Sequence, residues 1–428
     1  MSTQAPPRPL PVPPVGRPSA DERIPHPQEW PVYEDTALAE AVELLARGRS
    51  FDYDHGDELA GLETAFAGHH GRRYALALAS GTAALLAAYF ALGIEPGDEV
   101  IVSDYTFFST ATPLFLLGGV PVLCDAGGEN GNVTAAGIAE LITPRTVAIA
   151  VTHLWGHPCE LDAIAALARS RGLAFLEDCS HAHGSTYRSR PVGSAGDVAV
   201  FSAGARKLVS GGLGGMLLTD DGDLYARACL LSSFRHRTDL TIDVPGYEPF
   251  LTTGLGGNFR MSPVAAVLAK SHFDALRLLV ERRLANVSAL VERLAALPGL
   301  EAVPVAPDCT MGAWYDGVVA VDETCPYSRD ELVRLLQAEG LKVREPSTRP
   351  LHQYPLFRGA APAWCPPAAR AADACARAND RRFPWADRLF ERWLRLPVNF
   401  LWDETGTMVE PYAAAFERVL GTEPARHA

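Results

Sequence analysis

The sequence predicts an α/β protein with two domains: a large one built on a mostly parallel sheet covered by helices, and a smaller α+β one. Between about residues 73 and 219, short apolar strand-like runs alternate with helical runs, as a parallel sheet buried on both faces requires. After Pro298 this regular alternation ends. The chain has 428 residues, of which 48% are hydrophobic, and this is enough to bury sizeable cores in two domains.

The N-terminal segment is rich in proline and poor in apolar side chains. Such a composition neither forms a helix nor buries enough surface to become ordered by itself. We therefore expect residues 1–30 to form a flexible arm. A helix is expected from Asp35 to Gly48, because apolar residues recur there at helical spacing and glycine stands where a helix would end. Those apolar residues are Leu38, Ala41, Val42, Leu44 and Leu45.

The large domain is expected to span residues 31–297. Its strands are predicted at 74–79, 99–103, 120–125, 146–153, 174–179, 197–203 and 214–219. Helices are predicted at 81–92, 109–117 and 161–172, together with a long helical segment from Pro263 to Leu297. The middle of that segment has a clear period of 3.6 residues.

The small domain is expected to span residues 298–428. Strands are predicted at 317–322 and 341–344, with a helix at 328–340 between them. Ser328 and Glu331 have the spacing of a capping box at the start of that helix. Residues 359–367 are predicted to form a loop.

Composition excludes several classes of function. The formal net charge of −13 disfavours binding to nucleic acid or to an anionic membrane. No stretch is long and apolar enough to cross a membrane, and the N-terminus lacks the apolar core of a signal peptide, so we expect a cytoplasmic protein. The eight cysteines are scattered without a CxxC pair, and the histidines near residues 153–157 and 181–183 lack a matching ligand set. We therefore expect no metal site.

Two strand-to-helix junctions have features of a cofactor site, and ligands of open parallel sheets bind at such junctions. Ser80, Gly81 and Thr82 lead directly into a helix, whose free N–H groups and dipole suit a phosphate, although the same residues also serve as a plain helix cap. Phe107 follows the strand at 99–103. An aromatic side chain there could stack on a planar ring, or simply pack in the core.

Two further junctions carry charged groups. Asp178 ends an apolar strand, where a carboxylate needs a cation to offset the cost of burial, and a protonated pyridine nitrogen would serve. Lys207 lies in a turn of small residues followed by a glycine-rich run. Burial there would lower the pKa of its amine and make it nucleophilic. A single loop lysine is usually only exposed, but here the three other junctions precede it in a consistent order.

These motifs in this order resemble the DegT/StrS-type aminotransferases, which are pyridoxal-phosphate (PLP) enzymes of fold type I that make amino sugars and aminocyclitols. The resemblance runs from about Trp30 to Tyr412. It implies a seven-stranded, mostly parallel sheet in the large domain. The matching motifs are SGTAAL at 80–85, DYTFFSTAT at 104–112, EDCSHAHGS at 177–185, VGSAGDVAVFS at 192–202, the lysine at 207 and GNFRMSPVAA at 257–266.

The resemblance also implies a role for each matching residue. Lys207 would form the Schiff base with PLP and shuttle the proton, and Asp178 would pair with the pyridinium nitrogen. Asn258 would reach the phosphate in a neighbouring subunit, which implies a homodimer with sites at the interface. The remaining cofactor residues would be Phe107 on the ring, Gly81, Thr82 and Ser202 at the phosphate, and His181, at a position often occupied by glutamine, at the phenolic oxygen.

The implied reaction is transfer of an amino group from glutamate or glutamine to a keto-sugar, a keto-cyclitol or a related ketone. Trp155 and His157 are candidate substrate residues because they follow the strand at 146–153. Related sugar dehydratases have histidine at the lysine position, so Lys207 argues against dehydration. Two positions depart from the family pattern: Leu213 stands where a glutamate is usual and Ala203 where an aromatic is usual. The resemblance therefore does not extend to the donor and substrate contacts.

Of three alternatives to an aminotransferase, one stays open and two are disfavoured by the sequence. Leu213 and Ala203 leave room for a PLP enzyme that catalyses a reaction other than transamination. A non-catalytic regulatory relative is disfavoured by the intact Lys207 and Asp178. A nucleotide-binding Rossmann protein is disfavoured because no GxGxxG follows the first strand.

Overall fold

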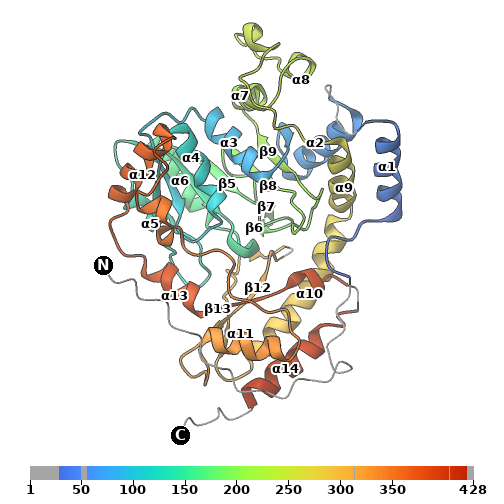
Figure 1. Ribbon diagram of the computed structural model, residues 1–428, viewed down its shortest axis with the longest axis vertical. Helices are drawn as coiled ribbons and strands as arrows, with labels where there is room; N and C mark the ends of the chain where they lie inside the picture. The colour runs from blue at the N-terminus through green and yellow to red at the C-terminus, as the bar shows by residue number, and fades with distance from the viewer. Residues whose placement is uncertain (1–27, 50–54, 313, 404, 422–428) are drawn as a thin grey trace.

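The computed structural model describes residues 28–49, 55–312, 314–403 and 405–421 (Figure 1). Of the predicted arm, all but residues 28–30 lie outside the described part of the chain. Trp30 is buried, and its backbone N–H donates to the carbonyl of Asn399. The predicted helix after the arm is confirmed as α1, Asp35–Ala46.

A seven-stranded sheet forms the centre of the protein, in the order β1-β9-β8-β5-β4-β2-β3. Neighbouring strands run parallel except at β9, which is antiparallel to β1 and β8. The predicted α/β class and mostly parallel sheet are thus confirmed. The strands are β1 (Tyr74–Leu78), β2 (Glu99–Ser103), β3 (Val120–Cys124), β4 (Thr146–Thr152), β5 (Ala174–Asp178), β8 (Val198–Ser202) and β9 (Gly215–Thr219).

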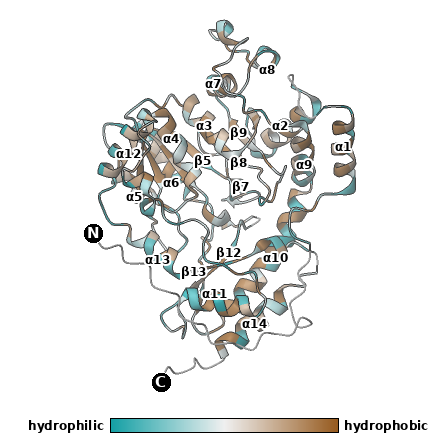
Figure 2. Ribbon diagram, viewed as in Figure 1, coloured by the Kyte–Doolittle hydropathy of each residue, from teal (hydrophilic) through white to brown (hydrophobic). Residues whose placement is uncertain are grey.

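Helices cover both faces of this sheet, because successive strand residues point to opposite sides. Leu76 and Leu78 belong to one apolar cluster, and Ala75 and Ala77 to the other. The apolar sides of the helices complete these two clusters (Figure 2). One face carries α3 (Gly81–Ala91), α4 (Thr112–Leu117), α7 (Gly222–Ser232) and α12 (Pro366–Ala378), and the other α2 (Asp57–His70), α5 (Ala135–Ala139), α6 (Leu161–Arg171) and α9 (Pro263–Asp274).

A second, antiparallel sheet of three strands lies beside the first, in the order β10-β12-β13 (Figure 1). The long helix α10 (Leu276–Ala295) links the two, because Leu276 packs in the core of the large sheet and Leu290 in that of the small one. The other elements here are β10 (Leu300–Ala302), β12 (Gly317–Val321), β13 (Trp393–Leu396), α11 (Arg329–Ala338), α13 (Pro384–Arg392) and α14 (Val409–Gly421). Shorter elements are β6 (Thr186–Tyr187), β7 (Arg190–Pro191), β11 (Cys309–Thr310) and α8 (His236–Thr241).

Two local predictions for the C-terminal region need correction. Residues 341–344 are not a strand, because their only ladder contact is an isolated bridge between Arg344 and Arg395. The predicted loop at 359–367 ends earlier, since α12 begins at Pro366. The capping box of α11 is confirmed: the Ser328 hydroxyl and the Glu331 side chain each accept a backbone N–H of the other.

The division into a large domain at 31–297 and a small domain at 298–428 stays a prediction. Two features of the structure cross this division. Helix α10 lies before residue 298 but packs in both cores. Helix α12 follows the small-sheet strand β12 in the chain but packs against α4 and β3 of the large region. Among the described residues, no helix is long and apolar enough to cross a membrane.

Candidate active site

The C-terminal ends of the parallel strands surround a cavity of about 300 Å³. It is bounded by the turn between β1 and α3, the segment after β2, the end of β5 and the loop after β8. Of the residues predicted to bind a cofactor, this cavity brings together Gly81, Thr82, Phe107, Asp178, His181, Ser202 and Lys207.

The start of α3 forms one wall of the cavity. The Ser80 hydroxyl caps the helix by accepting the Ala83 N–H at 3.0 Å. A Cβ atom on Gly81 would lie 2.8 Å from the Cβ of Ser202, and one on Gly215 would lie 2.4 Å from the Ser80 carbonyl oxygen. Only glycine allows these segments to approach so closely. The first N–H groups of the helix thus border the cavity without partners inside the helix, which suits an anion.

Asp178 is buried at the end of β5, with 3% of its surface exposed. Its Oδ2 accepts the Thr110 hydroxyl at 2.7 Å, and its Oδ1 accepts the Ser180 N–H at 3.0 Å. The Thr110 hydroxyl itself lies within hydrogen-bond distance of the Thr106 and Thr152 hydroxyls. Because these contacts hold the carboxylate yet leave each oxygen a free lone pair, Asp178 can receive a cationic group from the cavity.

Lys207 follows β8 in a turn closed by its own N–H, which donates to the Gly204 carbonyl at 2.9 Å. The Trp30 indole donates to the Lys207 carbonyl at 2.8 Å. Burial lowers the pKa of the amine to about 7, although the negative charges of Asp178 and Asp316 act in the opposite direction. Near neutral pH, a large share of the amine is therefore unprotonated and nucleophilic.

His181 lines the cavity between two aromatic rings. Its ring stacks on Tyr315 at 3.8 Å and lies 5.8 Å from Trp155. Burial, with the positive charge of Lys207, holds its pKa well below the usual value, so the imidazole is neutral. Its Nδ1 is buried and has no hydrogen-bond partner within the described chain. A buried polar atom without a hydrogen-bond partner costs free energy unless a ligand supplies the partner.

Three predicted site residues do not line the cavity. Trp155 is buried and lies behind His181. His157 is also buried, and its Nε2 accepts the Ala306 N–H at 3.0 Å, so its imidazole serves the fold. Asn258 is exposed and accepts a hydrogen bond from Arg260 at 3.1 Å.

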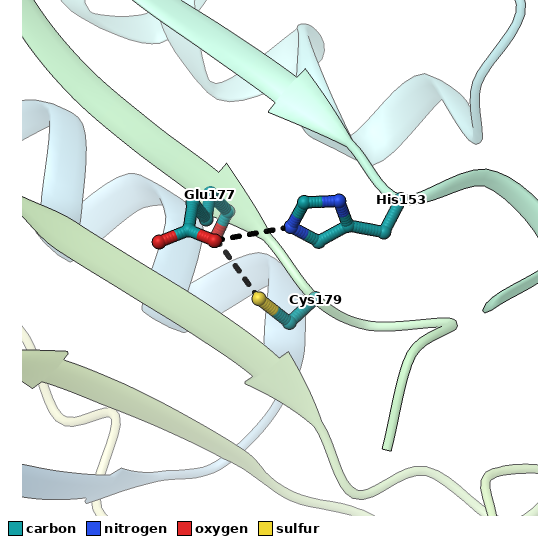
Figure 3. A group of neighbouring side chains, drawn as sticks. All are labelled: His153, Glu177 and Cys179. Carbon is teal, nitrogen blue, oxygen red and sulfur yellow. Dashed lines mark hydrogen bonds and ion pairs between the residues drawn. The ribbon is translucent and has the colours of Figure 1, made fainter. Parts of the chain in front are cut away.

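His153, Glu177 and Cys179 form a buried cluster with the composition of a metal site, contrary to the expectation that the histidine near 153 lacks a matching ligand set (Figure 3). Burial alone would raise the pKa of Glu177, but hydrogen bonds from His153 and from backbone N–H groups lower it to about 2. The backbone donors are Gly193, Ala195 and Gly196. The other ring nitrogen of His153 accepts the Cys159 N–H at 3.1 Å. These atoms are already satisfied, so the cluster anchors the loop at 193–196 and offers no open ligand set.

The sequence reasoning missed a charged group on the cavity wall. Arg206, next to Lys207, and Tyr315 line the cavity, and Asp316 is buried behind them. Arg395 on β13 donates to Asp316 at 3.0 Å. The sequence signals were present: an arginine directly precedes the lysine, and Tyr-Asp directly precedes the strand predicted at 317–322.

The chain is similar to known proteins in both sequence and structure. Residues 33–379 match the DegT/DnrJ/EryC1/StrS aminotransferase family. GDP-perosamine synthase of Caulobacter vibrioides is 34% identical over 298 residues, 69% of this chain and 77% of the relative. A putative L-glutamine:3-amino-2,3-dideoxy-scyllo-inosose aminotransferase of Streptomyces kanamyceticus is 33% identical over 305 residues, 70% of this chain and 71% of the relative.

Solved structures agree with this assignment. An aminotransferase from Psychrobacter cryohalolentis superposes with a TM-score of 0.80 and 29% identity, covering 93% of this chain and 99% of that one. The structure of 3-amino-5-hydroxybenzoic acid synthase superposes with a TM-score of 0.77 and 28% identity, covering 92% and 100%.

Proposed function

The chain belongs to the DegT/DnrJ/EryC1/StrS aminotransferase family, and from this premise we propose that it uses PLP to move an amino group from glutamate or glutamine to a ketone on a sugar or cyclitol. The observation that carries the proposal is the pairing, in one cavity, of the Lys207 amine with the Asp178 carboxylate. The names of the two relatives, a perosamine synthase and a scyllo-inosose aminotransferase, support the class of acceptor.

The cavity residues fit PLP. The start of α3, with Gly81 and Thr82, offers N–H groups for the phosphate, and Ser202 adds a hydroxyl. Asp178 offers a carboxylate for the pyridinium nitrogen, and the unpartnered Nδ1 of His181 suits the phenolic oxygen. Phe107, which is 44% exposed at the cavity, offers an aromatic face for the ring.

Lys207 performs two tasks in this proposal. Its unprotonated amine would bind the cofactor, and the amine of the donor would later displace it. Bound PLP supplies an electron sink, kept effective by the Asp178 carboxylate, that acidifies the hydrogen on the donor's α-carbon. The freed Lys207 amine would take that proton from the donor's α-carbon and return it on the far side of the transferred nitrogen.

The proposal includes a cytoplasmic homodimer. Asn258 is exposed and lies off the cavity of its own chain, as expected of a residue that serves a partner's site. Helix α1 also exposes an apolar stripe of Leu38, Val42 and Leu45, with exposed fractions of 44%, 64% and 55%. Covering such a stripe would favour association with a second copy.

The test is the absorbance spectrum of the PLP-loaded protein before and after addition of glutamate or glutamine. We expect a visible band from the lysine-bound cofactor, which the donor replaces with the band of the aminated cofactor. Lys207→Ala should show neither the band nor the conversion. Ser328→Ala, which removes a helix cap on α11, should show both.

The outcomes separate the alternatives. A band that ignores every amino acid would favour a PLP reaction other than transamination. Binding of PLP without a visible band in the wild type would favour a non-catalytic relative. Failure to bind PLP would overturn the proposal.

A further inference from the structure

A guanidinium group stands beside the reactive lysine. Arg206 precedes Lys207 and lines the same cavity, with 45% of its side chain exposed. Its guanidinium lies 5.8 Å from the centre of the Tyr315 ring. Among the described residues that line the cavity, only Arg206 and Lys207 are basic enough to act as cations, because His181 is neutral.

The guanidinium of Arg206 is only loosely held. Its nearest carboxylate is Asp316, at 3.6 Å, which is longer than a hydrogen bond. Within the part of the chain that the structure describes, the Arg206 side chain donates no hydrogen bond, and Oδ1 of Asp316 accepts none. An arginine has five N–H donors in a planar fork, so all of them are available to a ligand.

Asp316 already has a stronger partner. Its Oδ2 accepts Nη1 of Arg395 at 3.0 Å, and these two side chains are 1% and 6% exposed. Arg395 thus neutralises the buried carboxylate without Arg206. The three groups together carry one surplus positive charge, and Arg206 presents it to the cavity next to Lys207.

A partly exposed ion pair at 3.6 Å contributes little to stability. Stability therefore gives a weak reason for an arginine at this position. An amino acid donor brings a carboxylate on the same carbon as the amine that must reach the cofactor. A planar guanidinium binds a carboxylate through two parallel hydrogen bonds and fixes its orientation.

We propose that Arg206 binds the α-carboxylate of the amino donor. Because Arg395 already neutralises Asp316, the charge and the N–H donors of Arg206 stay available for this contact. The inference rests on the proposed function, since it assumes an amino acid donor. Leu213, which stands where the family pattern has a glutamate, is exposed and offers the donor no polar side-chain group.

The test compares donors that differ in a single carboxylate. PLP-loaded wild type and Arg206→Gln are mixed with glutamate, with glutamine and with the α-amide of glutamate, and the rate of cofactor amination is followed by absorbance. We expect Arg206→Gln to raise the half-saturating concentration of glutamate and of glutamine by about 10- to 100-fold. The α-amide, which lacks the α-carboxylate, should react equally with both proteins.

Two further variants sharpen the comparison. Arg206→Lys keeps the charge but loses the planar fork, so its half-saturating concentrations should fall between those of the wild type and Arg206→Gln. Arg277→Gln removes an arginine on α10 whose side chain is 83% exposed and should behave as the wild type. An independent readout is the dissociation constant of 2-methylglutamate, which lacks the hydrogen to be removed; it should rise in Arg206→Gln by a similar factor.

Each result has one meaning. If Arg206→Gln raises the half-saturating concentrations of glutamate and of the α-amide by the same factor, or raises neither, Arg206 does not bind the α-carboxylate and the inference fails. If it spares the donor but raises the half-saturating concentration of the acceptor, Arg206 binds the acceptor and the inference also fails. If the wild type reacts with no amino acid, it is the proposed function that fails.

Discussion

The reactive lysine combines a nucleophilic amine with a fixed backbone. Burial favours the neutral amine of Lys207 over the ammonium, while Asp178 and Asp316 limit the drop in its pKa. The hydrogen bond from the Trp30 indole to the Lys207 carbonyl holds the turn from the opposite side. The amine is therefore available near neutral pH, and it can still carry a proton when the reaction requires it.

The pH dependence of cofactor capture follows from this balance. Below about pH 7 most of the Lys207 amine is protonated and cannot attack the cofactor's aldehyde, whereas above it most of the amine is unprotonated. The rate at which the apoprotein forms the visible band with PLP should rise through about pH 7 and level off above it. Nα-acetyl-lysine is the control, and its rate should keep rising toward the ordinary lysine pKa near 10.4. A protein midpoint near 10 would contradict the assignment.

The sequence predicted the charged residues of the site better than the neighbours that support them. Asp178 ends an apolar strand and Lys207 follows one in a turn of small residues, positions where a charge is unusual, and both line the cavity. Trp30 and Asp316 could not be predicted in the same way, because each acts on Lys207 from a segment far away in the chain. For His157 the sequence was misleading. Its place after a strand suggested a substrate contact, but its ring Nε2 accepts the Ala306 N–H and its carbonyl accepts the Asn132 side chain, both within the fold.

At the scale of elements, the junctions between strands and helices determine the site. Helix α3 begins where β1, β8 and β9 come close together, and this requires glycine at positions 81 and 215. The spacing of apolar residues and the turn residues between them predicted the strands of the large sheet well. They failed at residues 341–344, because an alternation of apolar and basic residues only four long is also compatible with a single bridge. They also could not reveal that β9 is antiparallel, since strand direction is set by the long-range pairing.

Gly81→Ala tests the requirement for close approach at the start of α3. The added Cβ would lie 2.8 Å from the Cβ of Ser202, so α3 and β8 must separate. We expect a loss of about 1–3 kcal/mol in the free energy of unfolding, measured by denaturant titration, together with weaker PLP binding. Gly68→Ala is the matched control in α2, where a Cβ would meet nothing within 4 Å. It should be neutral or stabilising by up to about 1 kcal/mol. Equal effects of the two changes would contradict the steric argument.

At the scale of the whole molecule, the cavity lies at the carboxyl edge of the large sheet, and the second sheet contributes to its wall. Tyr315, just before β12, lines the cavity, and Arg395 of β13 anchors the neighbouring Asp316. Segments from both ends of the chain therefore meet at Lys207, which explains why no short motif describes the site completely. Asn258 is the exception, because within a single chain it is exposed and does not line the cavity that the other matching residues share.

If Asn258 contributes to the active site of the partner subunit, two inactive variants should regain activity when they are mixed, which a monomer could not do. Lys207→Ala and Asn258→Ala should each be inactive or strongly impaired as separate proteins. After the two are mixed and their subunits exchange, a hybrid dimer has one site with both wild-type residues and one site that lacks both. Random exchange makes about half of the dimers hybrids, so the mixture should recover about a quarter of the wild-type activity per site. Light scattering should give twice the mass of one chain. If exchange is demonstrated by mass spectrometry of a labelled subunit and no activity returns, Asn258 acts within its own chain and the shared site is excluded.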